Sequence, residues 1–181
     1  MYKSKIILLI SFLLLLNCQV EAGNPFENPK APKFMISNGQ LNINGTQFKQ
    51  PWKINPFLTA VGGKYVTKNL FHKVYTFDEL GIHIYEYPQK EEANEIQVSF
   101  VKQKMKFAPK NNFQGSFKIE KVAITRKTGI QKIMKSLPDY KFTKSPEGNS
   151  YRGEYKGVYI YLNYSTESLL DFISFGMTGR T

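Results

Sequence analysis

Leu80-Gly81-Ile82-His83-Ile84-Tyr85 has a counterpart 76 positions later in the chain, Lys156-Gly157-Val158-Tyr159-Ile160-Tyr161. In both stretches a glycine precedes alternating β-branched and aromatic residues, which is the pattern of a strand that follows a turn. Self-similarity at a fixed period is the mark of a repeated structural unit. The fold therefore depends on whether the same offset relates the rest of the chain.

The same offset aligns apolar and glycine positions without a gap from Gly39 to Tyr85. The aligned pairs are Gly39/Gly115, Leu41/Phe117, Ile43/Ile119, Phe48/Ile124, Ile54/Ile130, Phe57/Ile133, Leu58/Met134, Val61/Leu137 and Tyr75/Tyr151. Beyond this segment the second copy is one residue shorter, so Val98-Ser99-Phe100 aligns with Ile173-Ser174-Phe175. Chance similarity explains one matched strand more readily than strand, helix and strand at one offset. The sequence therefore predicts two tandem copies, repeat one over 34–107 and repeat two over 108–176.

Each copy is predicted to hold one helix among its strands. Helical spacing predicts a helix from near Asn55 to Gly62-Gly63, and another over Ile130–Leu137 that stops at Pro138. Asn38-Gly39 predicts a hairpin turn. Strands are predicted at Phe71–Phe77, Leu80–Tyr87, Glu95–Val101, Phe117–Ile119, Val122–Ile124, Tyr140–Phe142, Tyr151–Tyr155, Gly157–Tyr164 and Leu170–Phe175. The predicted fold class is α+β, with two ββαβββ repeats forming mostly antiparallel sheet. One helix per repeat would cover one sheet face and leave the other open.

Residues 1–22 indicate a secretory signal segment. Lys3 and Lys5 precede a continuous apolar run over 6–16, which is too short for an ordinary transmembrane helix. Residues 23–33 are rich in proline and predict an extended tether, because proline disfavours helix in itself and in the residue before it. Residues 177–181 are predicted to form a short tail.

Two modes of processing stay open. Val20-Glu21-Ala22 suits ordinary signal peptidase, which would leave a chain that starts at Gly23. Leu15-Leu16-Asn17-Cys18 resembles the lipobox of bacterial lipoproteins, in which Cys18, the single cysteine, becomes the acylated first residue. The sequence favours a lipid-anchored protein of the bacterial cell envelope, with a soluble periplasmic or secreted protein as the alternative. Neither form can hold an internal disulfide, so its core must supply its stability.

The residue inventory argues against an enzyme. His72 and His83, the two histidines, lie inside strand patterns and lack the spacing of metal ligands. Gly62-Gly63-Lys64 follows a predicted helix, whereas a phosphate loop precedes one. Asp78-Glu79 is better explained by a turn than by acid–base chemistry. We therefore expect no catalytic residue, no metal ligand and no cofactor.

Positive charge is concentrated in one segment. The formal net charge is +11, and residues 101–148 hold twelve Lys and Arg against three Asp and Glu. Alternation over Val101–Lys106 predicts a strand with Lys102, Lys104 and Lys106 on one face. A cationic face raises encounter rates with anionic partners, here an acidic protein or an anionic membrane surface. Export makes nucleic acid the least suitable partner.

The tandem plan, with its strands at Leu80–Tyr85 and Gly157–Tyr161, resembles two groups of proteins. One is the β-lactamase inhibitor protein family, and the other is the small outer-membrane assembly lipoprotein BamE. The resemblance implies tandem α/β repeats, which in the inhibitors present a concave sheet. The signal segment, together with Tyr75-Thr76-Phe77-Asp78-Glu79-Leu80-Gly81-Ile82, also looks like that of uncharacterised exported bacterial domains, a resemblance that implies no function.

These observations predict a non-enzymatic binding module. It would dock an acidic protein, in an inhibitor or immunity-like role, on its open sheet face. The residues expected to bind the partner are Tyr85, Tyr87, Tyr159 and Tyr161 with the lysine stripe Lys102, Lys104 and Lys106. The alternative is a structural envelope lipoprotein whose basic face lies on an anionic membrane surface.

Overall fold

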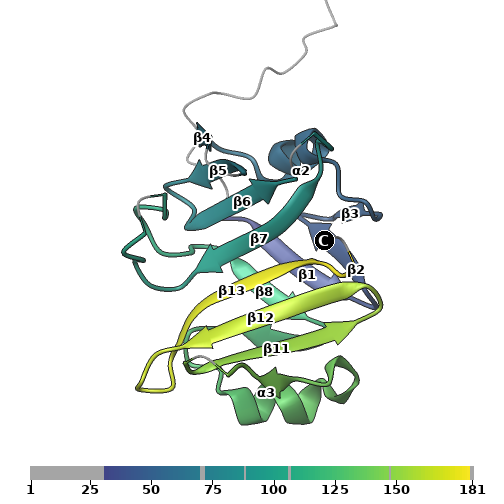
Figure 1. Cartoon of the computed structure of the whole chain (residues 1–181), viewed down its shortest axis with the longest axis vertical. Coiled ribbons are helices and arrows are strands. Elements are labelled where there is room, and N and C mark those ends of the chain that lie inside the picture. Colours follow the sequence, from purple (N-terminus) through teal and green to yellow (C-terminus); the bar gives the residue numbers. More distant parts are fainter. Residues whose placement is uncertain (1–30, 70–71, 88, 106, 147, 180–181) are drawn as a thin grey trace, which may run out of the picture.

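The structure is a computed structural model that describes residues 31–69, 72–87, 89–105, 107–146 and 148–179. These residues form two β-sheets that pack face to face, with the larger sheet in front in Figure 1. The predicted signal segment and Cys18 lie outside the described residues, as does most of the predicted tether. Lys33, at the end of that tether, is the first residue of β1.

The larger sheet has eight strands in the order β10-β11-β12-β13-β7-β6-β5-β4, and every neighbouring pair is antiparallel. The strands of its first half are β4 (Val66–Asn69), β5 (Lys73–Phe77), β6 (Ile82–Glu86) and β7 (Ala93–Ser99). The strands of its second half are β10 (Thr143–Lys144), β11 (Ser150–Tyr155), β12 (Val158–Tyr164) and β13 (Leu170–Met177). Met177, which was assigned to the tail, therefore ends the last strand.

The smaller sheet has five strands in the order β3-β2-β1-β8-β9. Its strands are β1 (Lys33–Ser37), β2 (Gln40–Ile43), β3 (Thr46–Phe48), β8 (Ser116–Ile119) and β9 (Val122–Ile124). β1 pairs antiparallel with β2 through the hairpin at Asn38-Gly39, as predicted. It pairs parallel with β8, so that Phe34 lies beside Phe117. This pairing joins residues about 80 positions apart and holds the two halves of the chain together.

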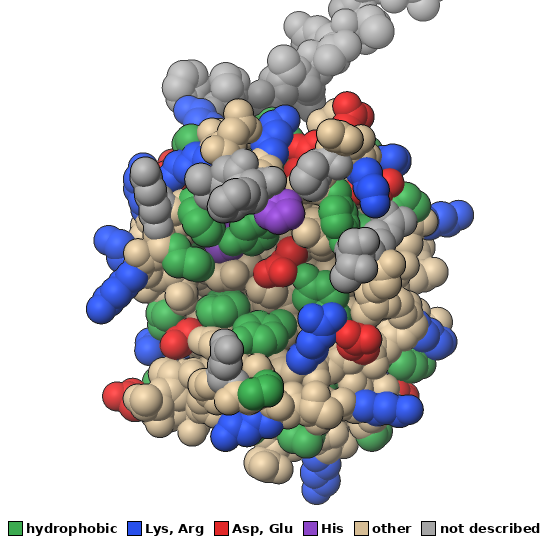
Figure 2. Space-filling model, viewed as in Figure 1, with side chains coloured by type: hydrophobic (Ala, Val, Ile, Leu, Met, Phe, Trp, Pro, Cys, Tyr) green, Lys and Arg blue, Asp and Glu red, His purple; other side chains and the backbone are tan. Residues whose placement is uncertain are grey.

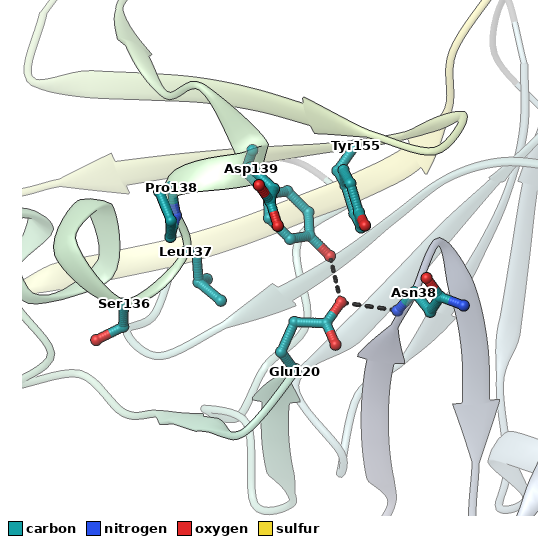
Figure 3. A pocket seen from close by; sticks show the side chains of 8 residues that line it. Asn38, Glu120, Ser136, Leu137, Pro138, Asp139 and Tyr155 are labelled. Carbon is teal, nitrogen blue, oxygen red and sulfur yellow. Dashed lines mark hydrogen bonds between the residues drawn. The ribbon is translucent and has the colours of Figure 1, made fainter.

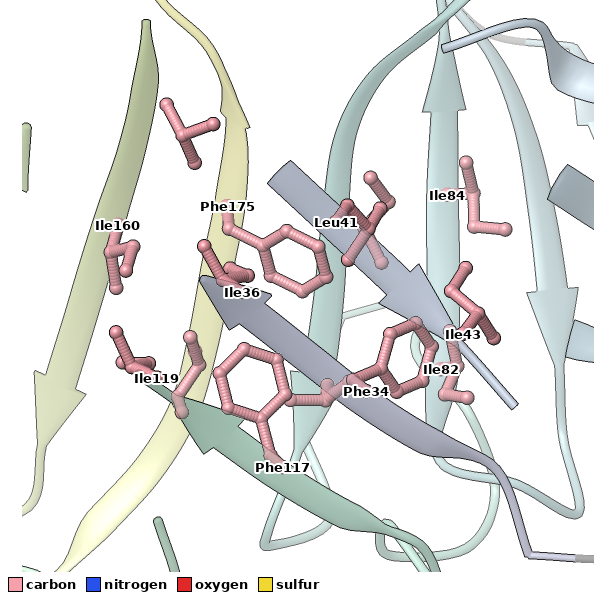
Figure 4. Close-up of a cluster of buried hydrophobic side chains, with 14 of the residues drawn as sticks. Phe34, Ile36, Leu41, Ile43, Ile82, Ile84, Phe117, Ile119, Ile160 and Phe175 are labelled. Atoms are coloured by element: carbon pink, nitrogen blue, oxygen red, sulfur yellow. The ribbon is translucent and has the colours of Figure 1, made fainter. Parts of the chain in front are cut away.

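One hydrophobic core lies between the sheets. Phe175 of β13 is at its centre, with ring centroids 5.9 Å from Phe34, 5.2 Å from Phe117 and 6.2 Å from Trp52. Figure 4 shows β1 and β8 crossing β13 and the neighbouring strands, with their aromatic side chains directed inward. Ile84 and Ile160, the central residues of the two opening stretches, are both fully buried in this core.

The larger sheet is symmetric about its centre, because equivalent strands of the two halves follow one another outwards in the same order. β7 and β13 meet at its centre, and β6, β5 and β4 follow β7 as β12, β11 and β10 follow β13. Val98 pairs with Ile173, the residue that the sequence alignment makes its counterpart. The larger sheet therefore has an approximate two-fold axis at this pair. β1 lies between β2 and β8 and has no counterpart among the described strands of the second half.

The predicted α+β class is wrong, because strands account for 45% of the structure and helices for 12%. The described residues form two α-helices, α2 (Ile54–Val61) and α3 (Ile130–Ser136), and one short 3-10 helix (Pro138–Tyr140). Figure 1 shows α2 and α3 at opposite ends of the molecule. The inner face of the larger sheet is covered by the smaller sheet instead. Strands of three to five residues from both halves assemble into that sheet, and local periodicity carries no signal of such long-range pairing.

The face of the larger sheet that points away from the core, here called the outer face, is partly covered by the segment between β7 and β8. Within that segment Phe107 packs against His83 and Tyr85, with ring centroids 6.0 and 6.1 Å away. Thr76 of β5 donates a hydrogen bond to the carbonyl oxygen of Phe107 (3.0 Å). The strand predicted over Val101–Lys106 is wrong, because residues 101–105 are irregular chain, and Gln103 and Met105 lie on the outer face.

Candidate functional site

An open cavity of about 360 Å³ lies on the outer face, where the two halves of the larger sheet meet. It is lined by Tyr85, Glu95, Gln97, Gln103, Met105, Arg152, Tyr159, Tyr161, Phe172 and Ser174. Figure 2 views this face directly, and shows apolar side chains around an acidic one near its middle, with one Lys or Arg side chain close by and others towards the margin. The cavity has a size typical of small-ligand sites, which span about 300–1,000 Å³.

Tyr159 of β12 is fixed from three sides. Its hydroxyl donates a hydrogen bond to Glu95 (2.8 Å), and the guanidinium of Arg152 lies 4.5 Å from its ring centroid. Below the ring is Gly176, where an added Cβ would come within 2.7 Å of the Tyr159 ring. Burial and the Glu95 carboxylate raise the pKa of the Tyr159 hydroxyl. Tyr159 is therefore a neutral hydrogen-bond donor with a defined orientation.

Arg152 is held at the edge of the cavity by its neighbour along β11. Its guanidinium donates two hydrogen bonds to one carboxylate oxygen of Glu154, at 3.0 and 2.8 Å. Both side chains are about half exposed, so this pair adds little to stability. Its effect is on geometry, because it keeps the guanidinium over the face of the Tyr159 ring.

Two further aromatic walls complete the cavity. Tyr161 of β12 stacks with Phe172 of β13 at a centroid distance of 6.0 Å and an interplanar angle of 30°. Tyr85 of β6 makes an edge contact with His83 at 5.1 Å. Burial, together with the charge of Glu95, raises the pKa of the Tyr85 hydroxyl to about 12. The aromatic rings thus come from both halves of the sheet.

Buried polar side chains lie below these rings. Gln97 is 4% exposed, and its side-chain oxygen accepts a hydrogen bond from Ser174 (3.3 Å). His83 lies across from Gln97 in the strand pairing and is fully buried. Neither the Gln97 Nε2 nor the two ring nitrogens of His83 make a hydrogen bond of good geometry with another described residue. Burial lowers the pKa of His83 to about 4, which the neighbouring Gln97 only partly offsets, so the ring is neutral at pH 7.

The structure brings together three of the four tyrosines that the sequence singled out, namely Tyr85, Tyr159 and Tyr161. Tyr87 lies one residue beyond β6, has Lys90 over its ring and does not line the cavity itself. Of the lysine stripe, Lys102 and Lys104 are exposed beside the lining residues Gln103 and Met105, and Lys106 lies outside the described residues.

Sequence reasoning missed the polar part of the site. Glu95 and Gln97 lie at alternate positions of β7, and Phe172 and Ser174 at alternate positions of β13. The period of two places each pair on one sheet face. The apolar residues Ile96 and Ile173, which lie between these positions in the sequence, are the signal that could have identified the face. They are fully buried and point to the opposite side of the sheet.

A second, smaller cavity of about 160 Å³ surrounds Glu120 in the turn between β8 and β9 (Figure 3). The Glu120 carboxylate accepts hydrogen bonds from the Ser37 hydroxyl (2.8 Å), the Asn38 backbone N–H (2.7 Å) and the Tyr140 hydroxyl (3.4 Å). These donors come from the first hairpin and from the 3-10 helix. Three donors satisfy the carboxylate, which identifies Glu120 as a structural tie between the two halves.

The described residues contain no group of three or more His, Cys, Asp or Glu side chains placed to hold a metal ion. No helix within the described ranges is long and apolar enough to cross a membrane.

A family model described as "Domain of unknown function (DUF7738)" matches residues 33–134, which is more than half of the chain. The match runs from β1 into α3 and so includes the cavity residues of β6 and β7 but not those of β11–β13. No curated protein and no solved structure matches the chain. The resemblance to β-lactamase inhibitor proteins and to BamE therefore stays a prediction.

Proposed function

Because the chain belongs to the DUF7738 family, a domain family of unknown function, its role must be argued from its site, and we propose that it is a non-enzymatic binding module. The observation that carries this proposal is the cavity on the outer face, around which Tyr85, Tyr159 and Tyr161 converge from both halves of the larger sheet. Concave, aromatic-lined surfaces with a few oriented polar groups are the usual form of binding sites.

The chemistry of the lining favours binding over catalysis. The tyrosine hydroxyls are poor bases or nucleophiles at pH 7, because burial and Glu95 raise the pKa values of Tyr85 and Tyr159. His83, the side chain best suited to proton transfer, is fully buried and lies outside the cavity lining. Glu95 is bonded to Tyr159, and among the described residues of the lining there is no nucleophile with an adjacent base.

Charge favours an acidic protein as the partner. Lys102 and Lys104 are exposed and flank Gln103, which lines the cavity, and we take them as its rim. Rim charges steer association and fix orientation, whereas buried aromatic residues supply most of the binding energy. An acidic protein with an apolar centre would match both parts of this surface. Inhibitor or immunity-like action is the form of this proposal that the sequence favours.

We also propose that the protein acts outside the cytoplasm, anchored in the bacterial cell envelope through Cys18. The basis is the signal-like segment and the lipobox-like stretch before Cys18, both of which lie outside the described residues. Intact-mass measurement of the mature protein tests it. The mass of a chain that begins at diacylated Cys18 is expected, and the mass of an unmodified chain that begins at Gly23 would contradict the anchor.

The partner proposal is tested with a charge-reversed variant, Lys102→Glu with Lys104→Glu. Proteins captured from envelope extract by the wild type are identified, purified and measured against both forms by calorimetry. We expect at least a tenfold loss of affinity at low salt and a smaller loss at high salt, because rim charges are screened. The matched control is Lys132→Glu with Lys135→Glu, two exposed lysines of α3 that do not line the cavity.

The alternative, a basic face that lies on anionic lipid, predicts a different result. Vesicles containing anionic lipid would then bind the protein, and both double variants would reduce binding by similar amounts, because surface association depends on total charge. Equal affinity of the wild type and the Lys102/Lys104 variant for every captured partner would contradict the proposed docking surface.

A further inference from the structure

The polar groups of the cavity differ in what they can bond. The Glu95 carboxylate is acceptor-only, and the Arg152 guanidinium is donor-only. The hydroxyls of Tyr85 and Tyr161 can do both, and neither bonds to another described residue. A ligand that fills the cavity must therefore supply several groups that each donate and accept. Hydroxyl groups have this property.

The apolar part of the cavity has a matching shape. Tyr161 and Phe172 stack to form one flat wall, and Met105 contributes a flexible apolar side chain from the covering segment. A flat aromatic surface suits a ring with an apolar face, since burial of that face is favourable and leaves the edge groups free to bond. Polar edge groups around an apolar ring face are the chemistry of a sugar.

Charge excludes the main competing ligand classes. A carboxylate would approach Glu95, and an unpaired like charge inside a partly desolvated site is costly. A cation would meet Arg152, which already occupies one face of Tyr159 at 4.5 Å, and the rim lysines. A wholly apolar ligand would desolvate Glu95 and Arg152 without bonding to them.

We propose that the cavity on the outer face binds a neutral saccharide ring. Tyr161 and Phe172 would stack on its apolar face, and Glu95, Arg152 and the hydroxyl of Tyr85 would bond to its hydroxyl groups. This site goes beyond the docking of an acidic protein, because it takes a small uncharged ligand and does not use Lys102 or Lys104.

The position of Tyr159 connects the site to the backbone below it. Gly176 pairs with Tyr159 across β12 and β13, and the space above its Cα is filled by the backbone carbonyl oxygen of Asn94 and by the tyrosine ring. Any side chain at position 176 would therefore clash with the strand backbone at Asn94 and displace the Tyr159 ring, together with the Arg152 that lies on it. Tyr159 is therefore a positioning residue for the proposed ligand, and Gly176 is the residue that makes its position possible.

The test is a titration of the full chain, labelled with ¹⁵N, by neutral sugars followed by NMR. The probes are glucose, galactose and N-acetylglucosamine at about 1–100 mM, the range in which a single small ring binds a preformed site. We expect at least one of them to give saturable shifts of the Gln97 side-chain amide and of backbone amides in β7, β12 and β13. Tyr161→Ala and Phe172→Ala should each weaken binding about tenfold, since each removes part of the stacking wall.

Tyr155→Ala is the matched control. Tyr155 is a half-buried tyrosine in the same half of the sheet, but it lines the Glu120 cavity and not the cavity on the outer face. It should leave sugar affinity unchanged. Gly176→Ala, checked for folding by its NMR spectrum, should weaken binding while Tyr161 and Phe172 stay in place. No saturable shift with any of the three sugars, or equal loss with Tyr155→Ala, would overturn the proposal.

Two other probes distinguish a sugar site from a site for a cation or for an apolar ligand. If tetramethylammonium or p-cresol shifts the Gln97 amide at lower concentration than every sugar does, the site prefers a cation or an apolar ring to a sugar, and the proposal fails. The Lys102→Glu, Lys104→Glu variant should bind the sugar as the wild type does. Failure of the saccharide site and failure of the acidic-protein partner are therefore independent results.

Discussion

The two halves of the larger sheet share a strand plan but differ in what lies on their outer face. At one pair of corresponding positions, 76 residues apart, the first half has His83 and the second has Tyr159. His83 is fully buried beneath Phe107, whereas Tyr159 lines an open cavity. Whether such a position is buried or lines a cavity therefore depends on the segment between β7 and β8 that covers the outer face, and not on the strand alone.

The turns between short strands show a second difference. Asn44 and Glu120, also 76 positions apart, both have positive φ angles, 52° and 51°. Asn44 accepts from the Lys33 backbone N–H and donates to the Ala60 carbonyl, both at 2.8 Å, so it ties its own half together. Glu120 reaches into the first hairpin and so ties the two halves to each other. The same backbone turn therefore supports contacts within one half at Asn44 and contacts between the halves at Glu120.

The largest effect is expected where the halves are most alike. Ile84→Ala and Ile160→Ala each remove a fully buried side chain from the same core, and each should lower the free energy of unfolding by about 2–5 kcal/mol. Urea unfolding measures both. Costs that differ by more than about 2 kcal/mol would show that the halves are not energetically equivalent, whatever their strand order.

The next effect should separate the halves by pH. Burial lowers the folded-state pKa of His83 to about 4, against about 6.5 in the unfolded chain, so the unfolded state takes up the proton first. Stability should therefore fall as pH drops from about 6.5 to 4, and His83 should account for about 3 kcal/mol of that loss. His83→Phe should remove this part of the pH dependence in urea unfolding at pH 7, 5.5 and 4.

Tyr159→Phe is the control at the corresponding position of the second half. It removes one hydrogen bond to Glu95, which should cost about 1 kcal/mol at every pH in this range. Its pH dependence should follow the wild type. If the wild type and His83→Phe lose stability in parallel between pH 7 and 4, the covering segment does not keep His83 from water.

A smaller effect is expected at the two turns. Glu120→Gln keeps one acceptor oxygen but loses charge-assisted bonding to three donors, and should lower the free energy of unfolding by about 1–2 kcal/mol. Asn44→Asp keeps the acceptor and loses the donor to Ala60, and should cost about 1 kcal/mol. Glu167→Gln, at an exposed position, is the control and should change stability by less than about 0.5 kcal/mol. A change at Glu120 as small as that control would contradict its role as a tie.

Much of the larger sheet could be predicted from the sequence, because its signals are local. Alternation after Gly81 and Gly157 located β6 and β12 to within two residues, and both glycines have positive φ angles at turns. Gly62 ends α2 as predicted, although that helix begins at Ile54 and its N-cap is Lys53 rather than Asn55. Tyr140 lies in a 3-10 helix and not in the strand predicted there.

The smaller sheet and half of the site could not be predicted in the same way. The parallel pairing of β1 with β8 joins Phe34 to Phe117, and no local pattern encodes which distant strand a short strand will choose. His83 was expected to be half exposed, but Phe107, 24 positions later, covers it. Tyr85, Tyr159 and Tyr161 were found because alternation alone placed them on one face.

The smallest effect concerns Thr76 and Arg152, the corresponding positions of β5 and β11. Thr76 is buried and bonds to Phe107, so Thr76→Val should cost about 1 kcal/mol and loosen the covering segment. Arg152 is exposed, so Arg152→Ala should cost less than about 1 kcal/mol, the sum of a weak ion pair and a cation–π contact. Hydrogen exchange of the amides from 107 to 113 should quicken in Thr76→Val alone. Equal exchange in both variants would mean that the hydrogen bond at Thr76 does not hold the cover, and that the closed half owes its closure to the aromatic contacts of Phe107.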